Sequence, residues 1–273
     1  MAEKKRLFAQ LRAIPVVARL GKHELGAIVA IFVAAALLLI FGSIAEEVME
    51  GDTHRIDRAV IMSFRTAGDP SDLIGPDWWE EMVRDVTALG SYAFVIIIVT
   101  AAIGYLLLMR KFGLALLLLA AEGGGMLISS LLKEFFDRPR PDLEHAARVF
   151  TASFPSGHAT LSAVTFLTLG ALLTRVTAER KSKLYFMGTA IVLTILVGLS
   201  RLHLGVHYPS DILAGWCTGS AWAATSYRGI EIRGLPSLEV EHVLGLLPRR
   251  MLLVEIALMA PWGRTWLIEP DWL

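Results

Sequence analysis

Long apolar runs separated by short polar segments dominate the pattern of residues along this chain. A helix needs roughly 20 mostly apolar residues to cross the hydrocarbon core of a bilayer. Six runs are candidates, the last three being shorter and starting near polar motifs: 25–45, 91–109, 112–132, 158–174, 184–200 and 212–227. The pattern therefore predicts an all-α fold, an integral membrane bundle of six transmembrane helices formed by residues 1–228.

Both ends of the chain bear on how it sits in the membrane. The first apolar run is too long for a cleaved signal peptide and lacks a clear cleavage site, so we interpret it as a retained signal anchor. Residues 229–273 are interrupted by four prolines, and their apolar run at 251–260 is too short to span a bilayer. We expect this segment to be a cytosolic or interfacial tail.

Lys and Arg residues cluster near the ends of the predicted spans. The clusters lie within 4–22, 110–111, 175–183 and 228–233. All four fall on one side of a six-span topology, and positive charge near span ends favours the cytosolic side. Both termini are therefore predicted to be cytosolic, with the segments 46–90, 133–157 and 201–211 on the outer face.

The outer segment 46–90 is rich in acidic residues and carries the pair Trp78 and Trp79. Tryptophans beside acids suit a helix that lies at the lipid interface. We therefore expect an interfacial helix here. A role in gating access of a substrate is the weaker alternative.

Composition supports the membrane assignment and excludes some partners. Hydrophobic residues make up 55% of the chain and charged residues 19%. The formal net charge is zero, so no overall field favours nucleic acid. The single cysteine, Cys217, cannot form a disulfide within the chain, and we interpret it as a small buried side chain.

Three polar stretches interrupt the apolar pattern on the predicted outer face. They are KEFFDRPRP at 133–141, PSGH at 155–158 and SRLHLGVHYPSD at 200–211. Ionisable groups at the edge of a membrane are costly, so each stretch is a hypothesis for a functional site.

These stretches resemble the motifs of the type 2 phosphatidic acid phosphatases, which share their site with vanadium haloperoxidases and glucose-6-phosphatase. The family pattern is Lys, six residues, Arg-Pro; then Pro-Ser-Gly-His; then Ser-Arg, five residues, His, three residues, Asp. The matching residues are Lys133, Arg140, Pro141, Pro155, Ser156, Gly157, His158, Ser200, Arg201, His207 and Asp211. No motif position is missing between the third predicted span and the sixth.

The residue types suit phosphate chemistry. A phosphate monoester carries nearly two negative charges, and its transfer spreads charge over three equatorial oxygens. Lys133, Arg140 and Arg201 can supply compensating positive charge, the arginines through forked contacts. Three cations could replace a metal ion, so we expect neither a metal nor a cofactor.

The PSGH stretch explains how an anion could be held at the start of the fourth span. Pro155 and Gly157 allow a sharp turn, Ser156 is a good helix cap, and the free amides of the first turn form an anion site. His158 then lies in that first turn and faces the same pocket. It is placed to act as an acid.

The third stretch places His207 and Asp211 four residues apart, a spacing that brings side chains together in a helical or turned backbone. The resemblance implies that Asp211 accepts a hydrogen bond from one nitrogen of His207 while the other nitrogen attacks phosphorus. A phosphohistidine would form. His158 would protonate the leaving group and then accept a proton from the hydrolysing water.

Other readings of these residues are weaker. His203 and His207 also show the spacing of zinc ligands, but Gly205 and Pro209 disfavour a regular helix there, and no acid lies between the histidines. Glu122 lies inside the third span. A buried structural hydrogen bond is the favoured interpretation of it, and a polar contact to substrate is the alternative.

We therefore expect a metal-independent phosphatase that hydrolyses a lipid phosphate or a polyprenyl or lipid pyrophosphate at the outer membrane-water interface. The resemblance suggests phosphatidic acid, phosphatidylglycerol phosphate, polyprenyl pyrophosphate and lipid A phosphates as substrates. Its setting would be a bacterial inner membrane, with the site facing the periplasm or cell exterior. The expected partners are the bilayer and a lipid substrate, with no nucleic acid; the oligomeric state stays open.

Two alternatives belong to other functional classes. One is a protein that binds or transports lipid phosphates without turnover, which the oriented pair His207 and Asp211 argues against. The other is an oxidative enzyme that binds vanadate, which six apolar spans disfavour because that group is soluble.

Overall fold

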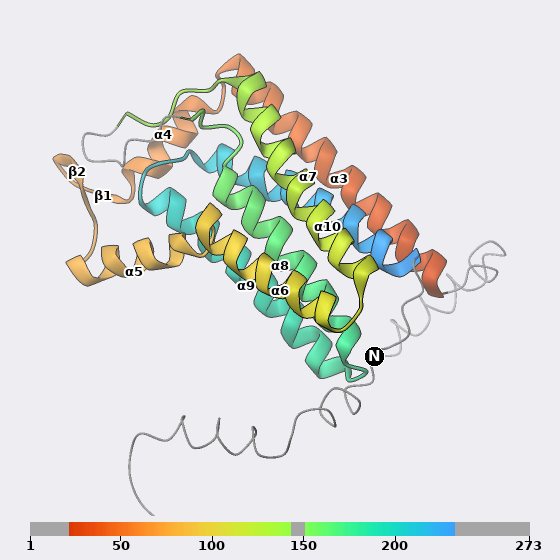
Figure 1. The fold of residues 1–273 in the computed structure, drawn as a ribbon. Coiled ribbons are helices and arrows are strands. Elements are labelled where there is room, and N and C mark those ends of the chain that lie inside the picture. The colour runs from red at the N-terminus through yellow and green to blue at the C-terminus, as the bar shows by residue number, and fades with distance from the viewer. Residues whose placement is uncertain (1–21, 143–150, 233–273) are drawn as a thin grey trace, which may run out of the picture.

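The computed structural model describes residues 22–142 and 151–232. Its long helices pack into a bundle (Figure 1). They are α3 (Lys22–Glu50), α6 (Tyr92–Leu108), α7 (Phe112–Phe136), α8 (Gly157–Val176), α9 (Arg180–His203) and α10 (Pro209–Ile232). Each predicted apolar run coincides with one of these helices, apart from Ser91 and Met109, which cap α6.

The described chain is a mostly helical integral membrane protein. Four of its helices, α3, α7, α8 and α9, are long and apolar enough to cross a membrane. A further helix, α5 (Asp77–Ala88), meets α6 at a bend of 46°, and the two together could make a fifth span. Helix α10 is not among these candidates by length and composition, so the count of six spans stays a prediction.

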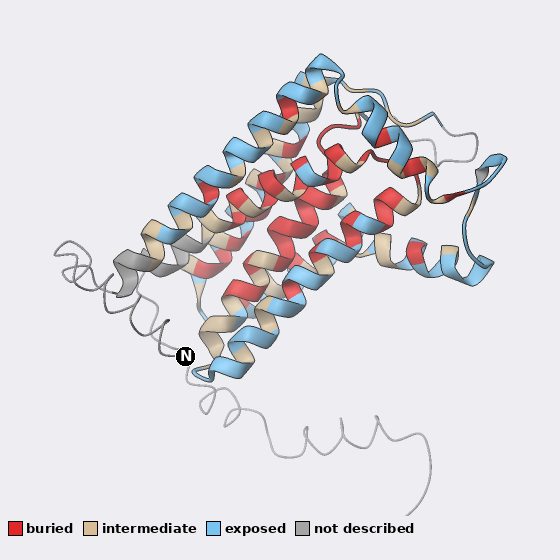
Figure 2. Ribbon diagram, turned by 180° about the vertical axis from the view of Figure 1, so that it is seen from behind, coloured by how far each residue is buried: buried red, intermediate tan, exposed pale blue. Residues whose placement is uncertain are grey.

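Helix α8 lies at the centre of the bundle, and its residues are buried on most sides (Figure 2). Small residues of α10 let the two helices approach closely. A Cβ added at Gly215 would lie 2.7 Å from the backbone oxygen of Ser156. Such close packing is typical of helices in membranes. There, helix association depends on van der Waals packing, which small residues allow, and not on the hydrophobic effect. It holds the first turns of α8 and α10 side by side.

The segment 46–90 contains more than helices. It comprises α4 (His54–Met62), the strands β1 (Arg65–Thr66) and β2 (Asp69–Leu73), and α5. The strands form an antiparallel hairpin that pairs Arg65 with Leu73. The described chain is mostly helical, as predicted, but the hairpin was not predicted, because strands this short and polar show no apolar alternation. Gly68, with φ of 92°, turns the chain between them.

A helix at the paired tryptophans is confirmed as α5, on which Trp78 is 61% exposed and Trp79 38%. Its position at the lipid surface stays a prediction. Some other expectations fall outside the described residues: the signal anchor's basic residues before 22, and the tail from 233 onward. The basic residues at 110–111 and 175–183 lie at the end of the bundle opposite α4 (Figure 1).

Candidate active site

The three polar motifs meet at one end of the bundle, where α7 and α9 end and α8 and α10 begin (Figure 1). Arg140 Nη1 lies 3.0 Å from His207 Nε2, which joins the first motif to the third. The backbone N–H of Ser156 donates to the carbonyl oxygen of Asp211 at 2.9 Å, which joins the second motif to the third. Residues more than 50 positions apart thus form one cluster.

His207 occupies the turn between α9 and α10 and is 2% exposed. Gly205, with φ of 69°, takes the left-handed conformation that ends the preceding turn. The ring nitrogen Nδ1 lies 3.4 Å from Asp211 Oδ2. The opposite nitrogen, Nε2, faces Arg140. Because a guanidinium only donates, Nε2 must accept, and the proton of the neutral ring sits on Nδ1.

The surroundings of His207 keep its ring neutral. Burial lowers its pKa to about 3, and the positive charges of Arg140 and Arg201 act in the same direction. Asp211 opposes this shift. At neutral pH the ring therefore carries a free lone pair on Nε2, which is the state that a nucleophile needs.

Asp211 is fully buried in the first turn of α10. Its Oδ2 accepts hydrogen bonds from the backbone N–H of Tyr208 at 2.9 Å and from the hydroxyl of Ser153. Its Oδ1 accepts from Arg138 Nη1 at 2.6 Å. A carboxylate with several donors around it stays ionised and holds a single orientation.

The predicted phosphate-binding cations are held by neutral oxygens. Lys133 Nζ donates to the carbonyl of Ala152 at 2.6 Å, and Arg140 Nη1 donates to that of Val206 at 2.8 Å. Arg201 Nη1 donates to Thr87 Oγ1 at 3.2 Å. Within residues 22–142 and 151–232, none of these three cations forms an ion pair with a carboxylate. They repel one another, so an anion between them would be strongly favoured.

Ser156 caps α8 in a way that differs from the prediction. It is the N-cap residue, and its carbonyl accepts the first helical hydrogen bond from Thr160 N at 2.9 Å, but its hydroxyl makes no capping bond. Its buried Oγ has no hydrogen-bond partner within the described part of the chain. The hydroxyl is thus available to a bound anion.

Gly157 and His158 begin α8 beside Lys133. A Cβ added at Gly157 would lie 3.4 Å from Lys133 Cε and 3.7 Å from Ser129 Oγ. The glycine therefore lets the ammonium group approach the helix start. His158 is half-buried, lies within electrostatic reach of His207 and the three cations, and is covered by the corner at Gly90 between α5 and α6.

Comparison with known proteins agrees with the motifs. Residues 114–234 match the profile of the PAP2 superfamily. This part of the chain is therefore similar to the PAP2 superfamily. The resemblance to the type 2 phosphatidic acid phosphatases is therefore confirmed.

Several proteins that are similar to this chain are named phosphatases. Phosphatidylglycerophosphatase B of Bacillus subtilis is 29% identical over 150 residues, covering 54% of this chain and 73% of the relative. Lipid A 1-phosphatase of Rhizobium johnstonii is 33% identical over 106 residues, or 35% of this chain and 39% of the relative. Undecaprenyl-diphosphatase of Sulfolobus acidocaldarius is 37% identical over 92 residues, which cover 34% of this chain and 39% of the relative. These names confirm the expectation of a phosphoric ester hydrolase.

The fold also resembles a solved PAP2 structure. The crystal structure of a transmembrane PAP2-type phosphatidylglycerolphosphate phosphatase from Bacillus subtilis superposes with a TM-score of 0.66. The two chains are 27% identical, and the match covers 74% of this chain and 97% of the other. The likeness supports an integral membrane architecture for this chain.

Sequence reasoning missed part of the cluster around the PAP2 motifs. Arg138 contacts both Asp211 and Asp57, although the family pattern names only the second arginine of RPRP. Asp57 of α4 is 2% exposed. A single acid among the apolar residues of a short amphipathic helix was the available signal for it. Ser153 also belongs to the cluster, since it lies against Asp211 and His207.

The structure also explains three residues that the family pattern does not include: His203, Glu122 and Cys217. The ring of His203 packs edge-on against Phe64 and Trp79, with ring centroids 5.5 Å and 6.1 Å away. Glu122 accepts a hydrogen bond from Thr165 at 3.0 Å, which confirms the expected buried contact. Cys217 is buried, as expected.

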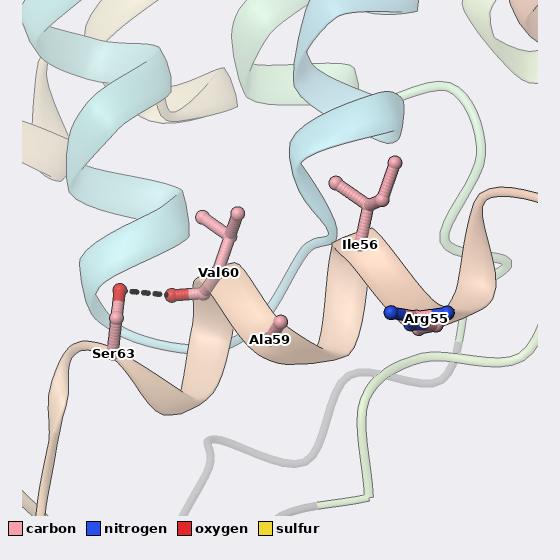
Figure 3. A pocket seen from close by; sticks show the side chains of 5 residues that line it. All are labelled: Arg55, Ile56, Ala59, Val60 and Ser63. Atoms are coloured by element: carbon pink, nitrogen blue, oxygen red, sulfur yellow. Dashed lines mark hydrogen bonds between the residues drawn. The ribbon is translucent and has the colours of Figure 1, made fainter.

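A hollow of about 390 Å³ lies apart from the motifs, on α4 (Figure 3). It contains none of the motif residues. The side chains drawn in Figure 3 line it: Arg55, Ile56, Ala59, Val60 and Ser63.

Proposed function

We propose that this protein is a metal-independent phosphatase that hydrolyses a lipid phosphate or a polyprenyl or lipid pyrophosphate through a phosphohistidine. The observation that carries the proposal is the arrangement of His207, whose Nε2 lies 3.0 Å from Arg140 while Nδ1 faces Asp211. This is the geometry of an oriented nucleophile beside a phosphate-binding cation. A site that only bound phosphate would need the cations but no oriented ring.

In the first step, Lys133, Arg140 and Arg201 hold the oxygens of the phosphoryl group. The amides at the start of α8 and the Ser156 hydroxyl add donors. The lone pair of Nε2 attacks phosphorus, and the bond from phosphorus to the leaving oxygen breaks. The electron pair leaves with that oxygen, and His158 protonates it.

In the second step, a water molecule attacks the phosphohistidine, and His158 accepts its proton. The bond between phosphorus and Nε2 breaks, which returns the neutral ring and releases inorganic phosphate. Throughout, the Nδ1–H of His207 stays directed at Asp211, whose negative charge stabilises the positive charge on the phosphorylated ring. None of these steps requires a metal or a dissociable cofactor.

The proposal extends to topology. Six spans would include α6 and α10, within a membrane domain of residues 1–228 followed by a cytosolic or interfacial tail at 229–273. The motif residues lie at one end of the bundle and the basic residues at 110–111 and 175–183 at the other (Figure 1). That separation supports cytosolic termini and a site on the outer face of a bacterial inner membrane.

The names of the relatives supply substrate candidates. They comprise phosphatidylglycerol phosphate, lipid A 1-phosphate, undecaprenyl diphosphate and decaprenylphosphoryl-5-phosphoribose. All of these place a phosphate or pyrophosphate on a lipid, so the shared chemistry is a head group presented at the membrane surface.

The test is phosphate release by purified protein in detergent, with this panel of lipids and a chelator present. We expect chelator-resistant release that His207→Ala abolishes, while His54→Ala, which changes an exposed histidine of α4, retains it. Acid-sensitive, base-stable labelling of the wild-type protein would identify the phosphohistidine. If no lipid releases phosphate, a binding protein without turnover becomes the better description.

A further inference from the structure

We propose that Arg138 and Asp57 are a positioning pair, which fixes Asp211 and thereby controls the orientation and basicity of His207. This inference rests on the proposed role of His207 as nucleophile. It assigns a function in catalysis to helix α4, which lies outside the matched domain at 114–234.

Arg138 bridges two carboxylates with one guanidinium. Its Nη1 donates to Asp211 Oδ1 at 2.6 Å and to Ser210 Oγ at 2.8 Å. Its Nη2 donates to Asp57 Oδ2 at 2.8 Å and to Thr53 Oγ1 at 3.3 Å. The planar fork can satisfy both acids at once, which the single ammonium of a lysine cannot.

Several contacts keep the guanidinium of Arg138 charged and in position. Burial would lower its pKa, but the negative charges of Asp211 and Asp57 outweigh burial and raise it. The guanidinium carbon also lies 4.4 Å from the centre of the Tyr208 ring. Tyr208 is the residue that follows His207 in the sequence. Arg138 therefore stays charged and immobile beside the turn that carries the nucleophile.

Asp57 holds the start of α10 directly as well. Its Oδ1 accepts from the backbone N–H of Ser210 at 3.1 Å, and its Oδ2 accepts from the Ser210 hydroxyl at 2.6 Å. Ser210 immediately precedes Asp211. The carboxylate thus acts as a helix cap supplied from α4, 153 residues away, and it fixes the turn in which Asp211 sits.

The second carboxylate has an electrostatic consequence. With Arg138 alone, Asp211 would be largely neutralised and would pull less on the Nδ1–H of His207. With Asp57 present, one cation is shared by two acids, and the group retains a net negative charge. That charge opposes the positive charges of Arg140 and of Arg201 on α9, which act on His207. The titratable ring of His158 on α8 lies within electrostatic reach of His207 and of the cations, Lys133 of α7 among them.

The experiment compares Arg138→Gln, Asp57→Asn and the double variant, using the lipid that the wild-type protein hydrolyses best. We expect kcat to fall about 10- to 100-fold in each single variant, as for other residues that orient a functional group. KM and inhibition by inorganic phosphate should stay near wild type, because the phosphate-binding cations are intact. The double variant should lose little more than the worse single variant, since both residues act through one contact.

The pH profile of kcat/KM separates positioning from simple stabilisation. Removing the cation Arg138 should move the acidic limb to higher pH, because His207 then binds a proton more readily. Asp57→Asn, which removes an anion, should not move the acidic limb to higher pH. A purely structural role would make both variants respond alike.

Two controls keep the outcomes distinct. Arg58→Gln, which removes an exposed arginine of the same helix, should leave kcat unchanged. Arg138→Lys should not restore turnover, because one ammonium cannot hold both acids. Variants that keep wild-type kcat, or that lose kcat and phosphate inhibition together, would overturn the positioning role. An inactive wild-type protein would instead overturn the proposed function, and the positioning role with it.

Discussion

The two sides of His207 are built on opposite principles. On the carboxylate side, formed by Asp211, Arg138, Asp57 and Ser153, charged groups are paired with one another in ion pairs and short hydrogen bonds. On the side proposed to bind phosphate, here called the phosphate side, the cations contact carbonyl and hydroxyl oxygens instead. Its residues are Lys133, Arg140, Arg201, Ser156 and Gly157. Paired charges give a fixed geometry, whereas cations without carboxylate partners retain their attraction for an anion.

One site can therefore hold some side chains rigidly and still attract an anion. Leaving a buried charge unpaired is costly, and proteins accept that cost mainly where function needs it. Removing residues from the two sides should therefore have different kinetic signatures.

The largest effect should come from the residue between the two sides. His207→Ala should lower kcat by at least about 10⁴-fold, since no other group can accept the phosphoryl group. Competitive inhibition by inorganic phosphate should persist, because the phosphate side is unchanged. Phosphate release and the inhibition constant for phosphate measure the two properties; full activity in this variant would remove the proposed nucleophile.

The next largest effect should come from the phosphate side. Arg140→Gln should lower kcat/KM by roughly 10²- to 10³-fold and weaken phosphate inhibition as well, because its guanidinium lies beside the reacting nitrogen. This combined loss contrasts with Arg138→Gln, two residues earlier, which should keep phosphate inhibition. Equal behaviour of the two variants would erase the distinction between the sides.

A smaller effect should follow from filling the space beside Lys133. Gly157→Ala would place a methyl group 3.4 Å from Lys133 Cε, at the start of α8. We expect kcat/KM to fall about tenfold through a displaced phosphate. Gly188→Ala on α9, where a Cβ meets nothing within 4 Å, is the matched control and should be neutral. A neutral Gly157→Ala would show that the phosphate does not approach this turn.

The pH dependence of stability should report the burial of His207. Its pKa falls from 6.5 to about 3 in the folded protein, so below pH 6.5 the unfolded state binds more protons. The contribution of His207 to stability is therefore complete above pH 6.5 and is lost as the pH falls toward 3. Thermal unfolding in detergent should show this decline, and it should be shallower in His207→Asn. Equal slopes would place the decline on other groups.

The smallest effect should come from the hollow on α4. Ala59→Leu adds apolar volume to a surface that contains no motif residue (Figure 3). Phosphate release should stay within about twofold of wild type, as for surface changes away from the site. A strong loss of activity would indicate that this hollow takes part in substrate binding.

The sequence predicted the long helices, because apolar length is a local property of the chain. It predicted the meeting of the three motifs because the order of the spans places all three on one face and because the motifs resemble those of a known site. It did not predict the hairpin at 65–73, whose strands are too short to show a pattern. Asp57 was missed for a different reason. Its partners Arg138 and Ser210 lie 81 and 153 residues away, and such distant pairing is decided by tertiary packing.

Ser156 shows the same limit at a smaller scale. Its place at the start of α8 was predicted from residue type, but its hydroxyl makes no capping bond. The Ser156 carbonyl accepts the first helical hydrogen bond from Thr160 N–H, whereas its hydroxyl has no partner within the described residues. Local propensity gave the position of this residue, whereas the bonds it makes depend on the whole site.

The contact between Asp57 and Ser210 has a consequence for the order of biosynthesis. Asp57 belongs to α4, which is synthesised well before α10, the last helix described, to which Ser210 belongs. Until α10 inserts, the carboxylate of α4 and the guanidinium after α7 have neither Ser210 nor Asp211 to bind. Under the proposed mechanism, a nascent chain that stops short of α10 has no Asp211 to orient His207, so hydrolysis would require α10 to be in place.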